Sequence, residues 1–181
     1  FRLLDEQLVA NNAIIRAVQT ASHHHKKQVL LVRGGPGTGK SVIALNVLGE
    51  ALRKELKVFL VSGSSAFTHG MRRILGKRMD ALVRFTDFFW NADPNSIDLL
   101  IIDEGHRIRA KSQPKVYGHL RPKISQVEEL MRAARVTVFF VDENQIISPT
   151  EVGEPDLIRA TAARLGADFQ DFSLVSQFRC N

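Results

Sequence analysis

The stretch VRGGPGTGKS, residues 32–41, decides the fold of this chain. It follows an apolar run at 29–32 and leads straight into an amphipathic segment, so it lies between a predicted strand and a predicted helix. A glycine-rich loop in that position can turn its backbone N–H groups inward around a phosphate, and the following helix N-terminus adds partial positive charge. Because Gly34, Gly39, Lys40 and Ser41 fit the pattern GxxxxGK[ST], the stretch predicts a phosphate-binding loop.

The residues of this loop have separate predicted tasks. Lys40 is expected to reach the β- and γ-phosphates of a nucleoside triphosphate, and the Ser41 hydroxyl to bind Mg²⁺. The full set of residues expected to surround the nucleotide is Gly35, Pro36, Gly37, Thr38, Gly39, Lys40 and Ser41. We therefore predict that the loop holds ATP together with Mg²⁺.

Short apolar runs alternate with helix-like segments along the rest of the chain. We predict strands at 29–32, 58–61, 99–102, 136–141 and 169–174, and helices at 5–22, 40–55, 64–79, 126–134 and 155–165. Nearly continuous apolar strands that alternate with helices indicate an α/β fold, three layers deep, with a mostly parallel central sheet. Ligands of such sheets bind outside the carboxyl ends of the strands.

A second site lies in LLIIDEGH, residues 99–106. Four apolar residues bury the strand, so Asp103 emerges at its carboxyl end, where it can hold Mg²⁺ through water. Glu104 can accept a proton from attacking water, which a hydrolase needs and a pure binder does not. His106 follows, and a lone histidine is more often a hydrogen-bonded structural residue than a catalytic one.

VTVFFVDENQ, residues 136–145, repeats this arrangement of a buried strand followed by polar residues. We predict that Gln145 senses the γ-phosphate and transmits its loss. By geometry alone Asp142, Glu143 and Asn144 compete for the same task.

Length and composition indicate one domain spanning residues 1–181, with 44% hydrophobic residues. The single cysteine, Cys180, excludes a disulfide framework and indicates a reducing compartment. No apolar run approaches a membrane span and no leader precedes the first helix, so we expect a cytoplasmic protein with no membrane partner. The net charge of +6 favours polyanionic partners.

GGPGTGKS, DEGHR, FFVDENQ and LVSQFRCN occur in this order along the chain. With these motifs the sequence resembles the first motor domain of superfamily 1 helicases, specifically the Schlafen-like DNA/RNA helicase domain family of bacterial proteins. The resemblance covers nearly the whole chain. It implies a RecA-like P-loop NTPase fold, ATP hydrolysis, a nucleic-acid partner and a second RecA-like domain. Because the chain ends at Asn181, we expect that second domain elsewhere in the parent protein.

The resemblance also assigns individual residues. It implies that Gln7 contacts adenine and that Arg179 points at the γ-phosphate as a charge-stabilising finger. It further implies contacts to the nucleic-acid backbone from Ser62, Gly63, Ser64 and Thr86. Gly105 stands where the family usually has alanine, a small-for-small exchange that we expect to be harmless.

Basic residues give separate support for a nucleic-acid partner. The segment 107–123 carries six Lys or Arg and no acidic residue, and Arg72, Arg73, Lys77 and Arg78 form a second cluster. Such patches meet phosphates by charge, without reading bases. A solvated basic face is an equally good interpretation of both clusters.

Two other functions fit part of the pattern. GGPGTGKS also resembles the phosphate loop of adenylate-type nucleotide kinases, but those enzymes need an arginine-rich lid instead of an Asp-Glu pair and a glutamine sensor. The second alternative is a module that binds ATP with little turnover, because the domain that completes the cleft is missing.

Overall fold

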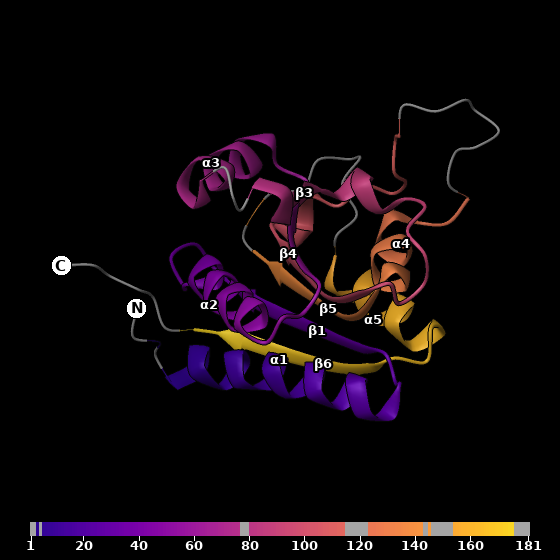
Figure 1. The fold of residues 1–181 in the computed structure, drawn as a ribbon, viewed down its shortest axis with the longest axis horizontal. Helices are drawn as coiled ribbons and strands as arrows, with labels where there is room; N and C mark the ends of the chain where they lie inside the picture. The colour runs from indigo at the N-terminus through magenta and orange to yellow at the C-terminus, as the bar shows by residue number, and fades with distance from the viewer. Residues whose placement is uncertain are drawn as a thin grey trace.

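The computed structural model describes residues 3, 5–76, 80–114, 123–142, 145 and 154–175 (Figure 1). Its α-helices are α1 (Asp5–His24), α2 (Lys40–Arg53), α3 (Ser65–Leu75), α4 (Gln126–Ala133) and α5 (Pro155–Arg164). Its strands are β1 (Gln28–Gly34), β2 (Val58–Ser62), β3 (Val83–Phe85), β4 (Ile97–Asp103), β5 (Ala134–Val141) and β6 (Asp168–Leu174). Short 3₁₀ helices occupy η1 (Asp80–Leu82), η2 (Thr86–Phe89) and η3 (Gly105–Arg107).

The six strands form one sheet in the order β3-β2-β4-β5-β1-β6. Every neighbouring pair is parallel. The carboxyl ends of all six strands therefore lie at one edge, and β5 separates β1 from β4. The predicted parallel α/β sheet is confirmed.

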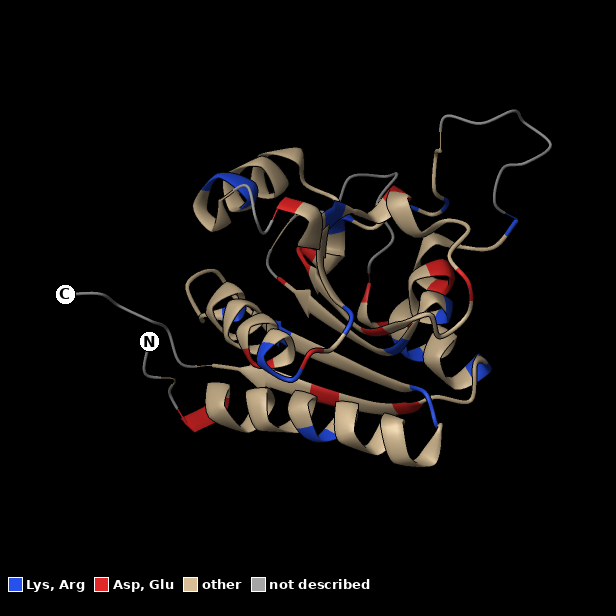
Figure 2. Ribbon diagram, viewed as in Figure 1, with Lys and Arg blue, Asp and Glu red and all other residues tan. Residues whose placement is uncertain are grey.

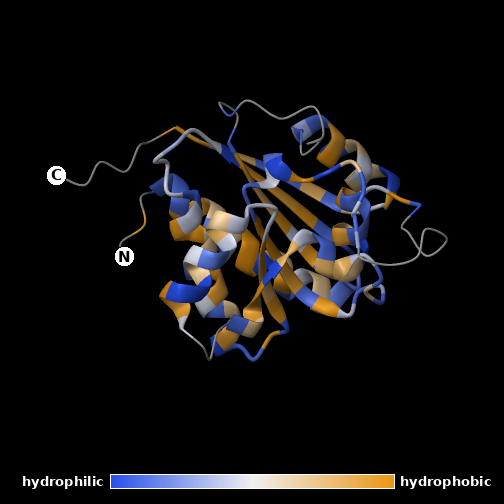
Figure 3. Ribbon diagram, turned by 90° about the horizontal axis from the view of Figure 1, so that it is seen from above, coloured by the Kyte–Doolittle hydropathy of each residue, from blue (hydrophilic) through white to orange (hydrophobic). Residues whose placement is uncertain are grey.

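Helices cover both faces of the sheet, which confirms the three-layer arrangement. Leu30 and Ile101 belong to the core under α1, α2 and α3, whereas Leu31 and Leu100 belong to the core under α4 and α5. Successive side chains of a strand point to opposite faces, so a strand buried on both faces is apolar throughout. Figure 3 shows these apolar strands running between the helices.

Helix boundaries follow local backbone chemistry. The Ser64 hydroxyl accepts a hydrogen bond from the Phe67 N–H and caps the start of α3. Gly76 follows at φ 77°, in the left-handed region that ends helices. The helix predicted over 64–79 therefore ends at Leu75, and residues 77–79 lie outside the described part. The first helix extends to His24, two residues beyond its predicted end.

Strand β3 was not predicted from the sequence. It contains three residues and pairs with β2 alone. Such a short strand shows no apolar periodicity. The Arg72 guanidinium donates to the Val83 carbonyl oxygen at 2.8 Å and so links α3 to this edge of the sheet.

None of the helices in the described residues is both long and apolar enough to cross a bilayer.

Candidate nucleotide site

The glycine-rich loop joins the end of β1 to the start of α2. Gly37 and Gly39 have φ values of 78° and 85°, which glycine adopts without strain. No atom lies within 4 Å of a β-carbon built at Gly37. Thr38 is buried, and its hydroxyl donates to the Gly35 carbonyl oxygen at 2.9 Å. The loop is thus fastened within itself and open to solvent at Gly37.

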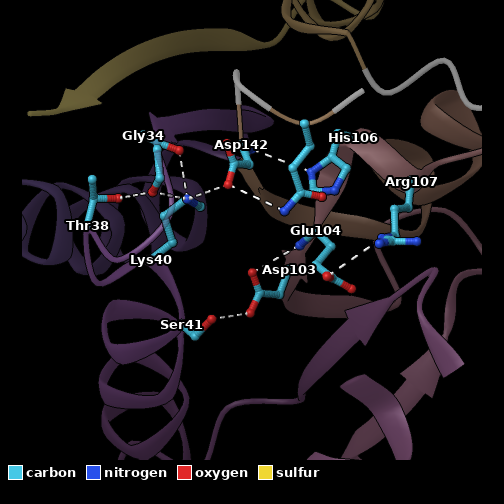
Figure 4. Close-up of polar contacts among 11 residues, drawn as sticks. Gly34, Thr38, Lys40, Ser41, Asp103, Glu104, His106, Arg107 and Asp142 are labelled. Atoms are coloured by element: carbon cyan, nitrogen blue, oxygen red, sulfur yellow. Dashed lines mark hydrogen bonds and ion pairs between the residues drawn. The ribbon is translucent and has the colours of Figure 1, made fainter. Parts of the chain in front are cut away.

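Lys40 lies at the centre of this loop (Figure 4). Its Nζ donates to the carbonyl oxygens of Gly34 at 2.7 Å and Gly35 at 2.8 Å. It also lies 3.7 Å from Oδ2 of Asp142, and only 12% of the lysine side chain is exposed. The ammonium group is therefore held where the loop carbonyls and the end of β5 meet.

Ser41 and Asp103 come together across the edge of the sheet. The Ser41 hydroxyl donates to Oδ2 of Asp103 at 2.7 Å, and the Glu104 N–H donates to Oδ1 at 2.9 Å. Asp103 is 2% exposed, and burial raises the pKa of its carboxyl above the usual range. A buried carboxylate beside a hydroxyl oxygen is a fitting place for Mg²⁺, because Mg²⁺ prefers oxygen ligands and its charge offsets the cost of burial.

The described residues hold no cluster of three or more metal-binding His, Cys, Asp or Glu side chains. A Mg²⁺ ion at Ser41 and Asp103 would take its other ligands from phosphate oxygens and water, as Mg²⁺ commonly does.

Glu104 faces away from the loop. Its backbone has φ 53°, in the left-handed region, where the chain turns from β4 into η3. Oε1 lies 3.6 Å from Nε of Arg107, and Oε2 accepts a hydrogen bond from the Ser62 hydroxyl at 3.4 Å. Figure 4 shows the carboxylate directed toward Arg107 and away from Lys40.

The polar residues after β5 form a short network. Gln145 Nε2 donates to Oδ2 of Asp142 at 3.4 Å, the same oxygen that lies near Lys40. Asp142 therefore contacts the lysine directly, and Gln145 contacts Asp142. Glu143 and Asn144, which the sequence left in competition with them, lie outside the described residues.

His106 belongs to this network as well. It is 2% exposed, and burial lowers the pKa of its imidazole. Its Nδ1 accepts the Asp142 N–H at 3.5 Å, which requires an unprotonated Nδ1. The geometry agrees with a hydrogen-bonded structural histidine.

Gln7 reaches the loop from α1. It is 1% exposed, and its Nε2 donates to the Thr38 carbonyl oxygen at 2.9 Å. The side chain thus ties the first helix to the glycine-rich loop. Its expected contact with adenine stays a prediction.

The residues expected to contact nucleic acid differ in exposure. Ser62 is 0% exposed and Thr86 is 6% exposed, so neither side chain is accessible to a nucleic-acid backbone in this structure. Ser62 ends β2, and the Glu104 side chain from the turn after β4 contacts its hydroxyl. The contacts of Ser62 and Thr86 with nucleic acid stay a prediction. Gly63 and Ser64 are half-buried and reach the surface.

The predictions for Arg179 and Gly105 have different outcomes. Arg179 lies outside the described residues, so its finger role stays a prediction. Gly105 packs closely under β5: an alanine methyl there would lie 3.1 Å from Cγ2 of Val141 and 3.2 Å from the Phe140 carbonyl oxygen. Glycine therefore suits this position, although the fit leaves little room for the alanine usual in the family.

The sequence placed Arg107 in the basic segment 107–123 but did not pair it with Glu104. The structure pairs it with Glu104 through a three-residue spacing across a tight turn. The only signal for this pairing was the presence of an arginine three residues after the glutamate in DEGHR.

Comparison with known proteins shows the family and the fold of the chain. The family model described as Schlafen group 3, DNA/RNA helicase domain, matches residues 27–181. No curated protein matches the chain significantly.

Several solved structures share the fold. The Pif1 helicase from Candida albicans is 15% identical, with a TM-score of 0.53 over 98% of this chain and 40% of its own. Bacteroides Pif1 bound to ssDNA is 12% identical, with a TM-score of 0.54 over 100% of this chain and 43% of its own. AMPPCP-bound DnaA from Aquifex aeolicus is 16% identical, with a TM-score of 0.50 over 95% of this chain and 48% of its own. The chain thus has a P-loop NTPase fold and spans less than half the length of these proteins.

Proposed function

The chain belongs to the Schlafen group 3 DNA/RNA helicase domain family, and we propose that it is the ATP-hydrolysing first motor domain of a superfamily 1-type helicase or translocase. The observation that carries this proposal is the meeting of Lys40, Ser41 and Asp103 at one edge of the sheet. Residues 1–181 would form one RecA-like domain, with a second in the parent protein.

The residues of the loop would bind the triphosphate. Lys40 would exchange its carbonyl partners for the β- and γ-phosphates, and the N–H groups of 35–39 would donate to phosphate oxygens. Ser41 and Asp103 would hold Mg²⁺, which neutralises charge on the phosphates when bound. Gln7 would hold the loop against α1 and lie next to the adenine.

Hydrolysis needs groups beyond those that bind. Glu104 would accept a proton from the attacking water. Asp142 and Gln145 would respond to the γ-phosphate through Lys40, since Asp142 lies beside the lysine. Arg179 would stabilise charge on the transferred phosphoryl group.

A nucleic-acid strand is the proposed partner. The net charge is +6. Gly63 and Ser64 precede the first turn of α3, and Arg72 and Arg73 lie in its last turn (Figure 2). Basic groups bind the phosphate backbone without reading sequence. Among proteins that share the fold, Bacteroides Pif1 is bound to ssDNA.

Two substitutions test the division of roles. Lys40→Ala removes a charged donor, so it should weaken binding of a non-hydrolysable ATP analogue about 10- to 100-fold. Glu104→Gln should leave that affinity within about twofold and lower hydrolysis about 10²- to 10⁴-fold. Calorimetric titration measures the first effect and phosphate release the second.

Equal loss of affinity in both variants would contradict these roles. Hydrolysis raised by AMP instead of by a single-stranded oligonucleotide would favour the nucleotide-kinase interpretation. Normal ATP binding with background hydrolysis, with or without a strand, would favour a binding module, which the direction of the Glu104 carboxylate away from Lys40 also favours.

A further inference from the structure

Both oxygens of the Glu104 carboxylate have partners that lie outside the phosphate loop. Arg107 Nε is 3.6 Å from Oε1, and the Ser62 hydroxyl donates to Oε2 at 3.4 Å. A base that serves the triphosphate has to turn toward the loop, where Lys40 lies. In this structure the carboxylate is held on the side of β2 instead.

The two partners belong to one packed unit. The Ser62 hydroxyl accepts the Ser64 N–H at 3.0 Å, so the loop 62–64 is fastened to the same atom that holds Glu104. A β-carbon at Gly63 would lie 2.9 Å from the Arg107 carbonyl oxygen, which is closer than such atoms approach. Movement of Gly63 and Ser64 therefore has to move the Ser62 hydroxyl, the Arg107 backbone or both.

The Arg107 guanidinium is accessible to a second anion. Its side chain is 42% exposed, beside the half-buried Gly63 and Ser64. A guanidinium binds carboxylate and phosphate with the same planar set of donors. A phosphodiester at the loop 62–64 and the Glu104 carboxylate would therefore compete for one side chain.

On the basis of the proposed function, we propose that Arg107 is shared between Glu104 and a phosphate of the nucleic-acid strand, so that strand binding releases Glu104 to act as the base. Arg107 thus becomes a strand-binding residue, and Ser62 becomes a positioning residue for Glu104. The strand contact and the hydrolytic base are coupled through one guanidinium and one hydroxyl.

Coupling of this kind is reciprocal, so it can be measured without nucleotide. Loss of the Glu104 charge frees Arg107 to bind a phosphate. Glu104→Gln should therefore bind a labelled oligo(dT) about two- to fivefold more tightly, a small effect because the ion pair is half-exposed. Arg107→Gln should bind more weakly and lower the slope of log affinity against log salt by about 1. The double variant should bind like Arg107→Gln alone, because the gain requires the arginine. Fluorescence anisotropy provides all three affinities.

A matched ion pair at the opposite edge of the sheet provides the control. Arg135 Nε lies 3.9 Å from Oδ1 of Asp98, with side-chain exposures of 41% and 32%, close to the 42% and 25% of Arg107 and Glu104. Asp98→Asn measures the general effect of removing one negative charge. Arg135→Gln measures the effect of removing one exposed arginine.

Hydrolysis gives a second readout. Without a strand, Arg107→Gln should raise kcat about 3- to 10-fold, because it frees the Glu104 carboxylate. A fully active general base contributes about 10²- to 10⁴-fold, so the increase is only part of that. It should leave the KM for ATP unchanged and bring stimulation by oligo(dT) close to none. Ser62→Ala should shift kcat in the same direction. Arg107→Lys keeps the charge and should restore part of the stimulation.

The outcomes separate this coupling from the proposed function. If the wild-type chain binds oligo(dT) but Glu104→Gln gains no more affinity than Asp98→Asn, Arg107 is not shared and only the coupling is wrong. If neither the wild-type chain nor any variant binds the strand, the coupling and the nucleic-acid partner both fall. Circular dichroism of each variant excludes unfolding as the cause.

Discussion

Lys27 and Lys40 lie at opposite edges of the same sheet, and both donate hydrogen bonds to backbone carbonyl oxygens. Lys27 Nζ donates to Oδ1 of Asn95 at 2.7 Å, to the Met131 carbonyl oxygen at 2.6 Å and to that of Ala134. Lys40 Nζ donates to two carbonyl oxygens of the glycine-rich loop. The chemistry of the two ammonium groups is similar, whereas their surroundings differ.

The partners of Lys27 join the end of α4 to the start of β5, and they stay fixed as long as the sheet is folded. Burial, with the nearby charge of Arg132, lowers the pKa of Lys27 to about 8. Lys40 instead lies in a loop that is open at Gly37. The lowered pKa of Lys27 therefore belongs to a lysine with a structural role. Position at the carboxyl edge of the sheet is the better guide to function.

The largest expected contrast comes from one substitution made at both lysines. Lys27→Met removes the ammonium donor from two part-buried carbonyl oxygens and should lower the free energy of unfolding by about 2 to 3 kcal/mol. Lys40→Met should weaken ATP binding about 10- to 100-fold. It should also cost some stability, because Lys40 donates to the carbonyl oxygens of Gly34 and Gly35, but its main effect is on the nucleotide. Urea unfolding and calorimetric titration measure the two effects. A loss of ATP affinity in Lys27→Met without loss of stability would contradict the structural role given to Lys27.

Two buried carboxyl groups extend the comparison to acids. Asp103 lies at the carboxyl edge, whereas Glu129 lies on α4, where it accepts a hydrogen bond from the Ser112 hydroxyl. Burial raises the pKa of Glu129 to about 7 from its ordinary 4.5. Between these values the folded state binds more protons than the unfolded state, so this group makes stability fall as pH rises through that window.

Glu129→Gln keeps the neutral shape and removes the titration. The unfolding free energy of the variant minus that of the wild type should therefore grow by about 2 kcal/mol between pH 5 and pH 8. Urea titrations across that range measure the difference. A difference that stays flat with pH would mean that Glu129 is ionised in the folded state throughout.

The smallest expected effect concerns the turn after β4. Gly105→Ala places a methyl against Phe140 and Val141 and should lower stability by about 1 kcal/mol. Gly70→Ala is the matched control, because no atom lies within 4 Å of a β-carbon at that helical position. It should raise stability by about 0.5 to 1 kcal/mol. Thermal unfolding compares the two, and equal shifts would mean that the turn is not closely packed.

Much of the fold and of the glycine-rich loop follows from the sequence. Apolar runs predict parallel strands, and a shared carboxyl edge predicts that Ser41 and Asp103 meet, as they do at 2.7 Å. The order of the strands is not encoded in the alternation of strands and helices. The contact of Lys40 with Asp142 depends on that order, because it requires β5 to lie beside β1.

Polar residues at strand ends were harder to interpret. Ser62 lies in a polar stretch that looks exposed in the sequence, yet it ends a central strand and the turn containing Glu104 covers it. The direction of the Glu104 side chain depends on Arg107 and on a left-handed backbone, which residue types alone do not predict. The short edge strand β3 gave no periodic signal.

The central claim is that the glycine-rich loop and Asp103 form one site for a magnesium-bound triphosphate. The direct test is a calorimetric titration of a non-hydrolysable ATP analogue, with and without Mg²⁺, into the wild-type chain and Asp103→Asn. We expect Mg²⁺ to strengthen binding in the wild type and to have little effect in the variant. Absence of saturable binding in the wild type, or an equal effect of Mg²⁺ in both proteins, would contradict the claim.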